Sequence, residues 1–432
     1  NVDFGRTWGD QQLNVWDAYH YFIGAKYFPE LRYSRIYACT AAAEGAPRRI
    51  RNFKTGLLER ADVSPAAKQK CRARFSKARW NEFVRDTAFF RGSASPNWWR
   101  SMLHDQGFNA SVVWLLAGHS LTRSVAATDL SFLLWLDVFL LMIAVGALYF
   151  AFGLRQAAVA ALFYSVFPPC AHYFVGGSIL RMDWLAATAV GLALLRVGRP
   201  ALAGAAIAYA GLLRLFPFLL FTGVLLKLIR GEGSSVELRR FFLGAFITTV
   251  GLVAAGAIAV GPRSYTDFAD HISRFESRPL TNQVGLRTAL AHPFSKRVEQ
   301  TRAMPVDNHW EVWAKSRQEA AALTFWVRVL ILAVFGWMFW MFAVERVELW
   351  KSVTLGLALI PLLADLPSYY TAYIALAAVL IENRPTVEIG LLLLAVGAQV
   401  LALTVFWTDD RYAWISMVTV VWAFTLPWSK DL

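Results

Sequence analysis

Apolar stretches that are as long as a membrane helix, or somewhat shorter, follow one another from residue 130 to residue 427. A helix needs about 20 mostly apolar residues to cross a bilayer, and it satisfies its own backbone hydrogen bonds there. We therefore expect an all-α polytopic membrane protein with about eleven membrane segments. The expected segments are residues 130–152, 157–175, 182–197, 200–213, 215–230, 240–261, 323–343, 352–366, 368–382, 387–407 and 411–427.

The polar stretches between these segments divide the chain into four parts. We expect residues 1–128 to form an extracytoplasmic loop region with amphipathic, interfacial helices, and residues 129–261 to form the membrane segments of a catalytic core. Residues 262–322 form a second extracytoplasmic loop, and residues 323–432 form the C-terminal membrane segments. A polar region at the beginning of a membrane protein has to be exported, so we expect a further membrane helix before Asn1.

The basic residues give a net charge of +13 and lie mainly between the apolar segments. They are suited to anionic headgroups or a phosphate-bearing substrate rather than to nucleic acid. Loops rich in Lys and Arg alternate along the chain, and the positive-inside rule assigns them to the cytoplasm. Every candidate functional group then lies on the extracytoplasmic face. We expect an integral protein of a bacterial inner membrane.

The chain has three cysteines, too few for a disulfide framework. Cys39 and Cys71 lie in the same polar region and could pair if that region is extracytoplasmic. Cys170 lies in an apolar run and is expected to be a small core residue. In the same polar region, Ser64-Pro65 and Ser95-Pro96 are each expected to start a helix. The first of these helices is basic and could lie on a membrane surface or present a solvated face.

Asp17 lies among aromatic residues in the sequence Trp16-Asp17-Ala18-Tyr19-His20-Tyr21. A carboxylate at the boundary of water and lipid can act as a general base towards a polar acceptor. It could also simply cap an interfacial helix. His20, three residues later, shares a helix face with Asp17 and could tune the acid, bind phosphate or be a structural histidine.

Arg214 lies at a predicted helix break, Gly211–Pro217, where its guanidinium could bind a phosphate in bidentate fashion. Alternatively it could extend from a short helix end to the headgroups. Arg181 and Asp183 could form a local ion pair or line a sugar pocket. The loop 262–322 contains a basic set, of which one or two members are expected to contact phosphate. Its members are His271, Arg274, Arg278, Arg287 and His292. In the same loop, Asn282 and Gln283 could bind sugar hydroxyls or cap a helix. We expect the Asp409-Asp410 pair to lie in a loop.

Residues 17–37, which read DAYHYFIGAKYFPELRYSRIY, resemble the first extracytoplasmic loop of GT-C glycosyltransferases. The resemblance is to the mannosyltransferase-like branch that includes the phosphatidylinositol-mannoside enzymes. Asn282-Gln283-Val284 resembles that branch's Asn-Gln-Ser stretch, and Gly211–Pro217 resembles its turn with a basic residue followed by proline. Two stretches depart from the family's pattern: Gly107–Val112 lacks the family's prolines, and Asp365–Tyr370 lacks its histidine.

The resemblance implies an inverting hexosyltransferase. It would move a hexose such as mannose from a polyprenyl-phosphate sugar to a lipid or glycan acceptor, with Asp17 as catalytic base. It implies Arg214, Arg287, His271 and Arg274 as ligands of the donor phosphate. The sugar or acceptor would contact His20, Tyr21, Asn282, Gln283, Arg181 and Asp183. A lipid-monophosphate donor needs no metal to mask a diphosphate, so we expect neither metal nor cofactor.

Two other functions fit the sequence. One is a catalytically degenerate GT-C-like subunit with a structural role in a larger membrane complex, to which the two altered stretches point. The other is a lipid or solute transporter. Transporters often contain inverted repeats and charges at mid-membrane. We detect no repeat, and the charges gather at one face.

Overall fold

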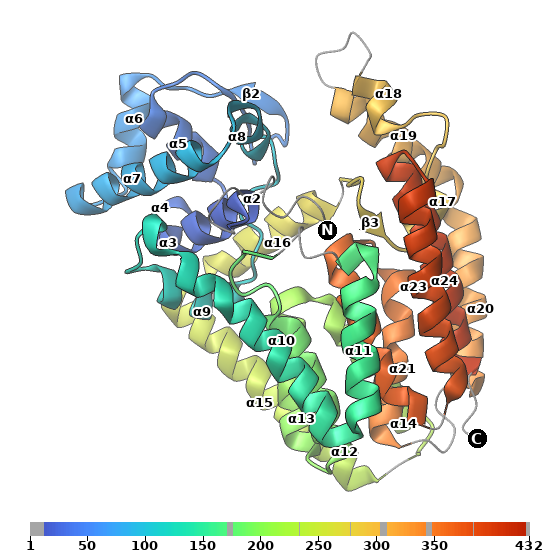
Figure 1. The fold of residues 1–432 in the computed structure, drawn as a ribbon. Coiled ribbons are helices and arrows are strands. Elements are labelled where there is room, and N and C mark those ends of the chain that lie inside the picture. The colour runs from blue at the N-terminus through green and yellow to red at the C-terminus, as the bar shows by residue number, and fades with distance from the viewer. Residues whose placement is uncertain are drawn as a thin grey trace. The chain divides into compact units, whose positions relative to one another are not determined.

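The computed structural model describes residues 13–170, 176–232, 234–276, 278–302, 309–342, 348–382 and 384–428. This part of the chain is almost entirely helical, with two short two-stranded ladders (Figure 1). The chain divides into two compact units. The first consists of Asn1–Leu140, His172–Asp183 and Val250–Ser277, and the second of Leu141–Ala171, Trp184–Thr249 and Arg278–Leu432.

The first unit is built mainly from short helices and one antiparallel ladder. Its elements are α2 (Val15–Ala18), η2 (Tyr19–Ile23), α3 (Gly24–Lys26), α4 (Phe28–Leu31), α5 (Ile36–Glu44), β1 (Arg49–Arg51), β2 (Leu58–Arg60), α6 (Pro65–Arg72), α7 (Lys77–Ser93), α8 (Pro96–Met102), α9 (Val112–Thr122), η3 (Ala127–Asp129) and α16 (Arg263–Glu276). Two long helices, α10 (Ser131–Phe152) and α15 (Ser235–Val260), contribute residues to both units.

The predicted helix starts in the first unit are confirmed. Ser64 and Ser95 each accept a hydrogen bond from a first-turn backbone N–H, and a proline follows each of them at the first helical position. The core that these helices cover is aromatic. Tyr27, Phe83 and Trp99 are among its fully buried side chains. Gly24 is required on α3, because a Cβ there would come within 2.4 Å of the Phe108 ring.

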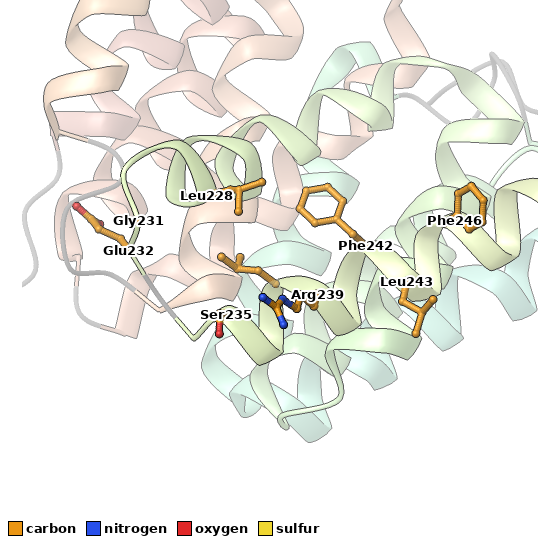
Figure 2. Close-up of a pocket in the computed structure, with 9 residues that line it drawn as sticks. Leu228, Gly231, Glu232, Ser235, Arg239, Phe242, Leu243 and Phe246 are labelled. Atoms are coloured by element: carbon orange, nitrogen blue, oxygen red, sulfur yellow. The ribbon is translucent and has the colours of Figure 1, made fainter.

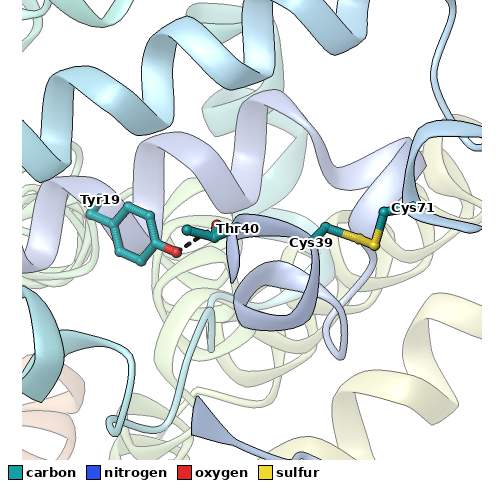
Figure 3. Close-up of a disulfide and its surroundings, with 4 residues drawn as sticks. All are labelled: Tyr19, Cys39, Thr40 and Cys71. Atoms are coloured by element: carbon teal, nitrogen blue, oxygen red, sulfur yellow. Dashed lines mark hydrogen bonds between the residues drawn. A yellow bond between two sulfur atoms is a disulfide. The ribbon is translucent and has the colours of Figure 1, made fainter. Parts of the chain in front are cut away.

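Cys39 on α5 and Cys71 on α6 form a disulfide, with their Cα atoms 5.5 Å apart (Figure 3). The pairing considered from the sequence is thus present. Next to Cys39, the Thr40 hydroxyl lies 2.9 Å from that of Tyr19, a residue of the buried core. Helix α6 has no buried residue of its own. The disulfide therefore ties a basic helix with no buried residue to a helix that packs in the core.

The second unit contains longer helices and a second short ladder. Its elements are α11 (Leu154–Val166), η4 (Pro168–Cys170), α12 (Asp183–Arg196), α13 (Pro200–Arg214), η6 (Phe216–Leu220), α14 (Phe221–Ile229), β3 (Gln283–Val284), α17 (Leu286–Leu290), α18 (Val298–Arg302), α19 (His309–Leu323), α20 (Phe325–Phe342), α21 (Leu349–Leu355), η7 (Gly356–Leu359), α22 (Ile360–Leu363), β4 (Leu366–Pro367), η8 (Ser368–Glu382), α23 (Pro385–Thr404) and α24 (Thr408–Trp428).

Glycines allow α13 and α15 to pack backbone against backbone. A Cβ on Gly204 of α13 would lie 2.0 Å from the carbonyl oxygen of Phe241, and one on Gly244 of α15 would lie 1.8 Å from that of Ala201. Small residues at helix crossings are typical of membrane helices, which associate through close van der Waals contact. This contact fixes α15 beside the helix that ends at Arg214.

Three described helices are long and apolar enough to cross a membrane: α10, α15 and α23. A fourth span is possible by the same measure if the bent pair Trp310–Leu323 and Phe325–Met341, with a 57° bend, counts as one. The expected number of about eleven segments is not confirmed. The other apolar helices in the described ranges have 10–17 residues, and Pro200–Arg214 and Phe216–Ile229 flank the predicted break.

Candidate functional site

The Asp17 carboxylate is paired with a buried guanidinium within the first unit. Asp17 Oδ2 lies 3.3 Å from Arg181 Nε, and the Asp17 side chain keeps 15% of its surface exposed, against 3% for Arg181. The Arg181 guanidinium also lies over the Tyr21 ring, 4.3 Å from its centroid. Tyr21 donates a hydrogen bond from its hydroxyl to Asn109, at 2.7 Å. Asp17 is thus held by a fixed cation while it remains reachable from solvent.

The helix that carries Asp17 has an unusual turn. The Asn14 side chain caps α2 by accepting a hydrogen bond from the Asp17 backbone N–H. From Tyr19 to Ile23 the chain then forms a π-helix, η2, before it returns to α-helix at Gly24. Single π-turns inside α-helices occur frequently at functional sites. Asn14, and not Asp17, therefore caps this helix, and the Asp17 side chain is available for another role.

The segment that carries Arg181 is fixed from three sides within the first unit. The Trp114 indole donates to the carbonyl of Leu180 at 3.0 Å, and the Asn14 backbone donates to the carbonyl of Gly177 at 3.1 Å. Asp137 Oδ1 accepts from the backbone N–H groups of Arg181 and Met182, at 2.7 and 2.9 Å. Leu180 has a φ of 50°, which is strained for a leucine. These contacts maintain the strained turn and orient Arg181.

Asp137 was not among the residues predicted from the sequence, although a signal was present. It is an acidic residue within the apolar helix α10, and ionisable residues within membrane helices usually have a function and a partner. The residue is 7% exposed. Its Oδ2 is buried and has no hydrogen-bond partner among the described residues. Asp137 therefore belongs to the site as the residue that positions the Arg181 segment.

Replacing Asp137 by leucine is expected to release the backbone of Arg181 and Met182. A buried N–H without an acceptor costs roughly 1–3 kcal/mol, so hydrogen exchange at these two amides should accelerate by about 5- to 150-fold. Asp137→Asn is the matched control, because its amide oxygen can accept both bonds. Exchange measured by mass spectrometry on the two variants tests this. Unchanged protection of both amides in Asp137→Leu would show that Asp137 does not hold the turn.

His20 is enclosed in the first unit and uses both ring nitrogens. Its Nδ1 donates to the Trp16 carbonyl and its Nε2 accepts from the Tyr37 hydroxyl, both at 2.7 Å. The Tyr37 hydroxyl in turn accepts from the Gly107 backbone at 2.9 Å. This chain of bonds connects η2 to two other segments and supports a structural role for His20.

His271 is also buried in the first unit, between the rings of Tyr33 and Phe53. Burial, aided by the positive charge of Arg274, lowers the pKa of His271 to about 4, and a hydrogen bond with the backbone of Gln106 opposes this effect. Its imidazole is therefore neutral near pH 7. A neutral imidazole carries no positive charge, so any contact of His271 with a phosphate would be a hydrogen bond only. Arg274 itself is exposed on α16.

Acid is expected to destabilise the first unit through His271. As pH falls below the ordinary histidine value of 6.5, the unfolded chain takes up a proton that the folded chain binds only at about pH 4. Stability should therefore be lost between these two values, by about 3 kcal/mol in total. The melting temperature of wild type and of His271→Phe, measured from pH 7.5 to 4, tests this. The variant should lose clearly less stability over that range; parallel curves would contradict the assignment.

In the second unit, the predicted Asn282-Gln283 and Asp365–Tyr370 stretches pair with each other. Strand β3 is antiparallel to β4, with Gln283 opposite Pro367 and Val284 opposite Leu366. The Gln283 side chain accepts from the Leu280 backbone at 3.0 Å and donates to the Asp365 carbonyl at 3.4 Å. Asn282 Nδ2 donates to the Ser368 hydroxyl at 3.4 Å. These side-chain amides support the ladder of β3 and β4.

Two of the three arginines predicted to bind phosphate, Arg214 and Arg287, lie beside this ladder within the same unit. Arg214 is the last residue of α13, is 9% exposed, and its guanidinium lies 5.9 Å from the centre of the Tyr370 ring. Arg287 lies on α17 and, with Arg317, acts electrostatically on Asp365. Three stretches that are far apart in the sequence, around Arg214, Gln283 and Tyr370, therefore gather in one place. Asp183, which belongs to the first unit, is the first residue of α12, where a carboxylate is favoured by the helix dipole.

A second acidic group in this unit involves the adjacent aspartates. Asp409 and Asp410 were expected in a loop, but they lie in the first turn of α24 and are buried. Together with His292 they place ligand atoms within 4.8 Å of one another, a spacing that could hold a metal ion. These side chains already form hydrogen bonds with other residues of the protein. Arg317 donates to His292 Nδ1 at 3.0 Å, which leaves Nε2 to donate to Asp410 at 2.7 Å.

The remaining partners of this group are also internal. Arg297 donates to Asp410 at 2.7 Å, and Trp313 donates to Asp409 at 3.0 Å. Burial lowers the pKa of His292, consistent with a neutral ring that accepts from Arg317. The group is thus a satisfied network that fastens the start of α24 to α18 and α19. A metal ion would have to displace two arginines from it.

The predicted site residues therefore form two groups, one in each unit. Asp17, Arg181 and Tyr21 lie in the first, and Arg214, Arg287 and the β3–β4 ladder lie in the second. Comparison with protein-family models, with curated proteins and with solved structures finds no match to this chain.

Proposed function

We propose that the protein is an inverting membrane glycosyltransferase of the GT-C type, which transfers a hexose from a polyprenyl phosphate to a lipid or glycan acceptor. The observation that carries the proposal is the Asp17–Arg181 pair: a partly exposed carboxylate held 3.3 Å from a buried guanidinium. A general base needs this combination of access and fixed orientation.

In the proposed reaction, Asp17 accepts the proton of the acceptor hydroxyl as the oxygen attacks the anomeric carbon. The bond from that carbon to the phosphate oxygen breaks, and polyprenyl phosphate leaves with the electron pair. The anomeric centre is inverted because attack and departure occur on opposite faces of the sugar. Arg214 and Arg287 are proposed as ligands of the donor phosphate, because a guanidinium binds phosphate oxygens through several hydrogen bonds. Arg181 keeps the Asp17 carboxylate in position.

The proposed orientation places the first unit on the extracytoplasmic side of a bacterial inner membrane. The Cys39–Cys71 disulfide supports this orientation, because disulfides persist in oxidising compartments. We further propose that some of the shorter apolar helices complete the membrane domain beside α10, α15 and α23. Helices interrupted within the membrane are tolerated where they are buried in protein or line a cavity.

The experiment is a transfer assay with the purified protein in liposomes. Polyprenyl-phosphate mannose, radiolabelled in the sugar, serves as donor, and a total lipid extract supplies acceptors. We expect label to move to a new lipid or glycan while free polyprenyl phosphate accumulates in equal amount. Polyprenyl-phosphate glucose and a nucleotide-linked mannose form parallel arms. Consumption of only the nucleotide sugar, or of no donor at all, would refute the proposal.

A further inference from the structure

A pocket of about 540 Å³ opens between the end of α14 and the first half of α15 (Figure 2). It lies wholly within the second unit, and no predicted site residue lines it. Leu228 comes from α14, and Ser235, Arg239, Phe242 and Phe246 come from α15. In Figure 2 the Leu228 side chain faces α15, where Arg239 and Phe242 lie.

The lining changes from polar to apolar along one face of α15. Ser235, Arg239, Phe242 and Phe246 are spaced by three or four residues, so they lie on the same side of the helix. The polar pair is nearer the helix start, and the aromatic pair follows. At a rise of about 1.5 Å per residue, Arg239 and Phe246 are about 10 Å apart along the axis. The pocket therefore has a charged end and an apolar end.

The apolar end is exposed on a helix of membrane length. Phe246 is 66% exposed and Leu243, which also lines the pocket, is 56% exposed. Aromatic and aliphatic side chains so exposed on a helix long enough to cross a membrane are expected to contact lipid chains.

The charged end of the pocket contains the guanidinium of Arg239. Arg239 is exposed, and among the described residues no carboxylate lies within 4.0 Å of it. Glu232, the acidic residue of the pocket, faces Arg230 at 3.9 Å, so its charge is balanced locally. The Arg230 guanidinium in turn lies 4.6 Å from the centre of the Trp340 ring. Arg239 is thus the residue through which the pocket would attract an anion.

We propose that this pocket binds one anionic phospholipid. The headgroup phosphate lies at Arg239 and Ser235, and an acyl chain follows Phe242, Leu243 and Phe246. Arginine suits phosphate because its planar guanidinium donates several hydrogen bonds at once. Basic residues near the membrane surface also attract anionic headgroups. The proposal is independent of sugar transfer, since none of these residues belongs to the proposed reaction.

Native mass spectrometry of the detergent-purified protein tests the proposal. Phosphatidylglycerol and phosphatidylcholine with identical acyl chains are titrated against wild type, Arg239→Gln and Arg240→Gln. We expect wild type to retain phosphatidylglycerol preferentially, and Arg239→Gln to bind it roughly fivefold more weakly. Arg240→Gln is the matched control, because Arg240 is also exposed but does not line the pocket, and it should bind within twofold of wild type. Equal loss in both variants, or equal binding of the two lipids by wild type, would overturn the proposal.

A competition arm distinguishes a lipid site from a simple phosphate site. Glycerol 3-phosphate, in large excess, should leave phosphatidylglycerol bound, because it cannot occupy the apolar end. Displacement by glycerol 3-phosphate alone would show that the pocket recognises only phosphate and would refute the lipid assignment. The same titration on Asp17→Asn should match wild type. Loss of sugar transfer and loss of lipid binding can therefore be distinguished.

Discussion

Asp17→Asn is expected to lower the rate of sugar transfer by a factor of roughly 10²–10⁴, the usual contribution of a positioned general base. Asparagine has nearly the same shape and keeps an oxygen atom that can face Arg181, but it cannot take the acceptor's proton. The loss should therefore appear in kcat, while the KM for the polyprenyl-phosphate sugar changes little. Initial rates over a range of donor concentrations measure both.

The control for this result is Asp62→Asn. Asp62 is exposed in the same unit and accepts a hydrogen bond from the Ser64 backbone, which asparagine can also accept. It should retain the wild-type rate. An Asp17→Asn variant that turns over within tenfold of wild type would exclude Asp17 as the base. A variant with normal kcat but a raised KM would instead indicate that Asp17 only binds substrate.

Lys26→Met is expected to reduce the free energy of unfolding of the first unit by about 3–5 kcal/mol, the range for breaking a buried ion pair. Lys26 is fully buried, and its ammonium lies 2.7 Å from both Glu82 and Asp86. Asp86 also accepts from the Tyr27 hydroxyl and the Ala127 backbone. Without the ammonium, the buried Asp86 carboxylate loses this cation, while Glu82, which is 27% exposed, keeps its pairing with Arg79.

Thermal unfolding of the purified variants measures this effect. Asp86→Asn in the Lys26→Met background removes this unpaired charge and should restore part of the lost stability. Lys54→Met, an exposed lysine in the same unit, should stay within about 0.5 kcal/mol of wild type. If Lys26→Met were as stable as Lys54→Met, the buried lysine would contribute no net stability to the fold.

Local features were predictable from the sequence because they depend on neighbouring residues. The serine-proline pairs start helices where expected, and the break after Arg214 is present. The number of membrane spans was not predictable in this way. Hydropathy registers apolar composition but not where a helix ends, and the expected segment 368–382 forms the tightly wound helix η8 instead of a full α-helix.

In the candidate site, the sequence did not predict contacts between residues that are far apart along the chain. Asp137 was recognisable as an acid in an apolar helix, yet its partners lie 44 and 45 residues away. Asp409 and Asp410 were expected in a loop, and their partners could not be foreseen because His292 and Arg297 lie 118 and 113 residues from Asp410. By contrast, the pairing of Gln283 with Pro367 agrees with the expectation that these stretches share one face. Motifs indicated which segments matter, but their partners are set by the tertiary fold.

The bridge between α5 and α6 also dictates when, during biogenesis, the chain can finish folding. Thiols stay reduced where ribosomes work, so under the proposed orientation Cys71 must be translocated before it can be oxidised. Helix α6 buries no residue of its own, and nothing else in its sequence would hold it as firmly before that step. The cell would then complete the unit that contains Asp17 only after export.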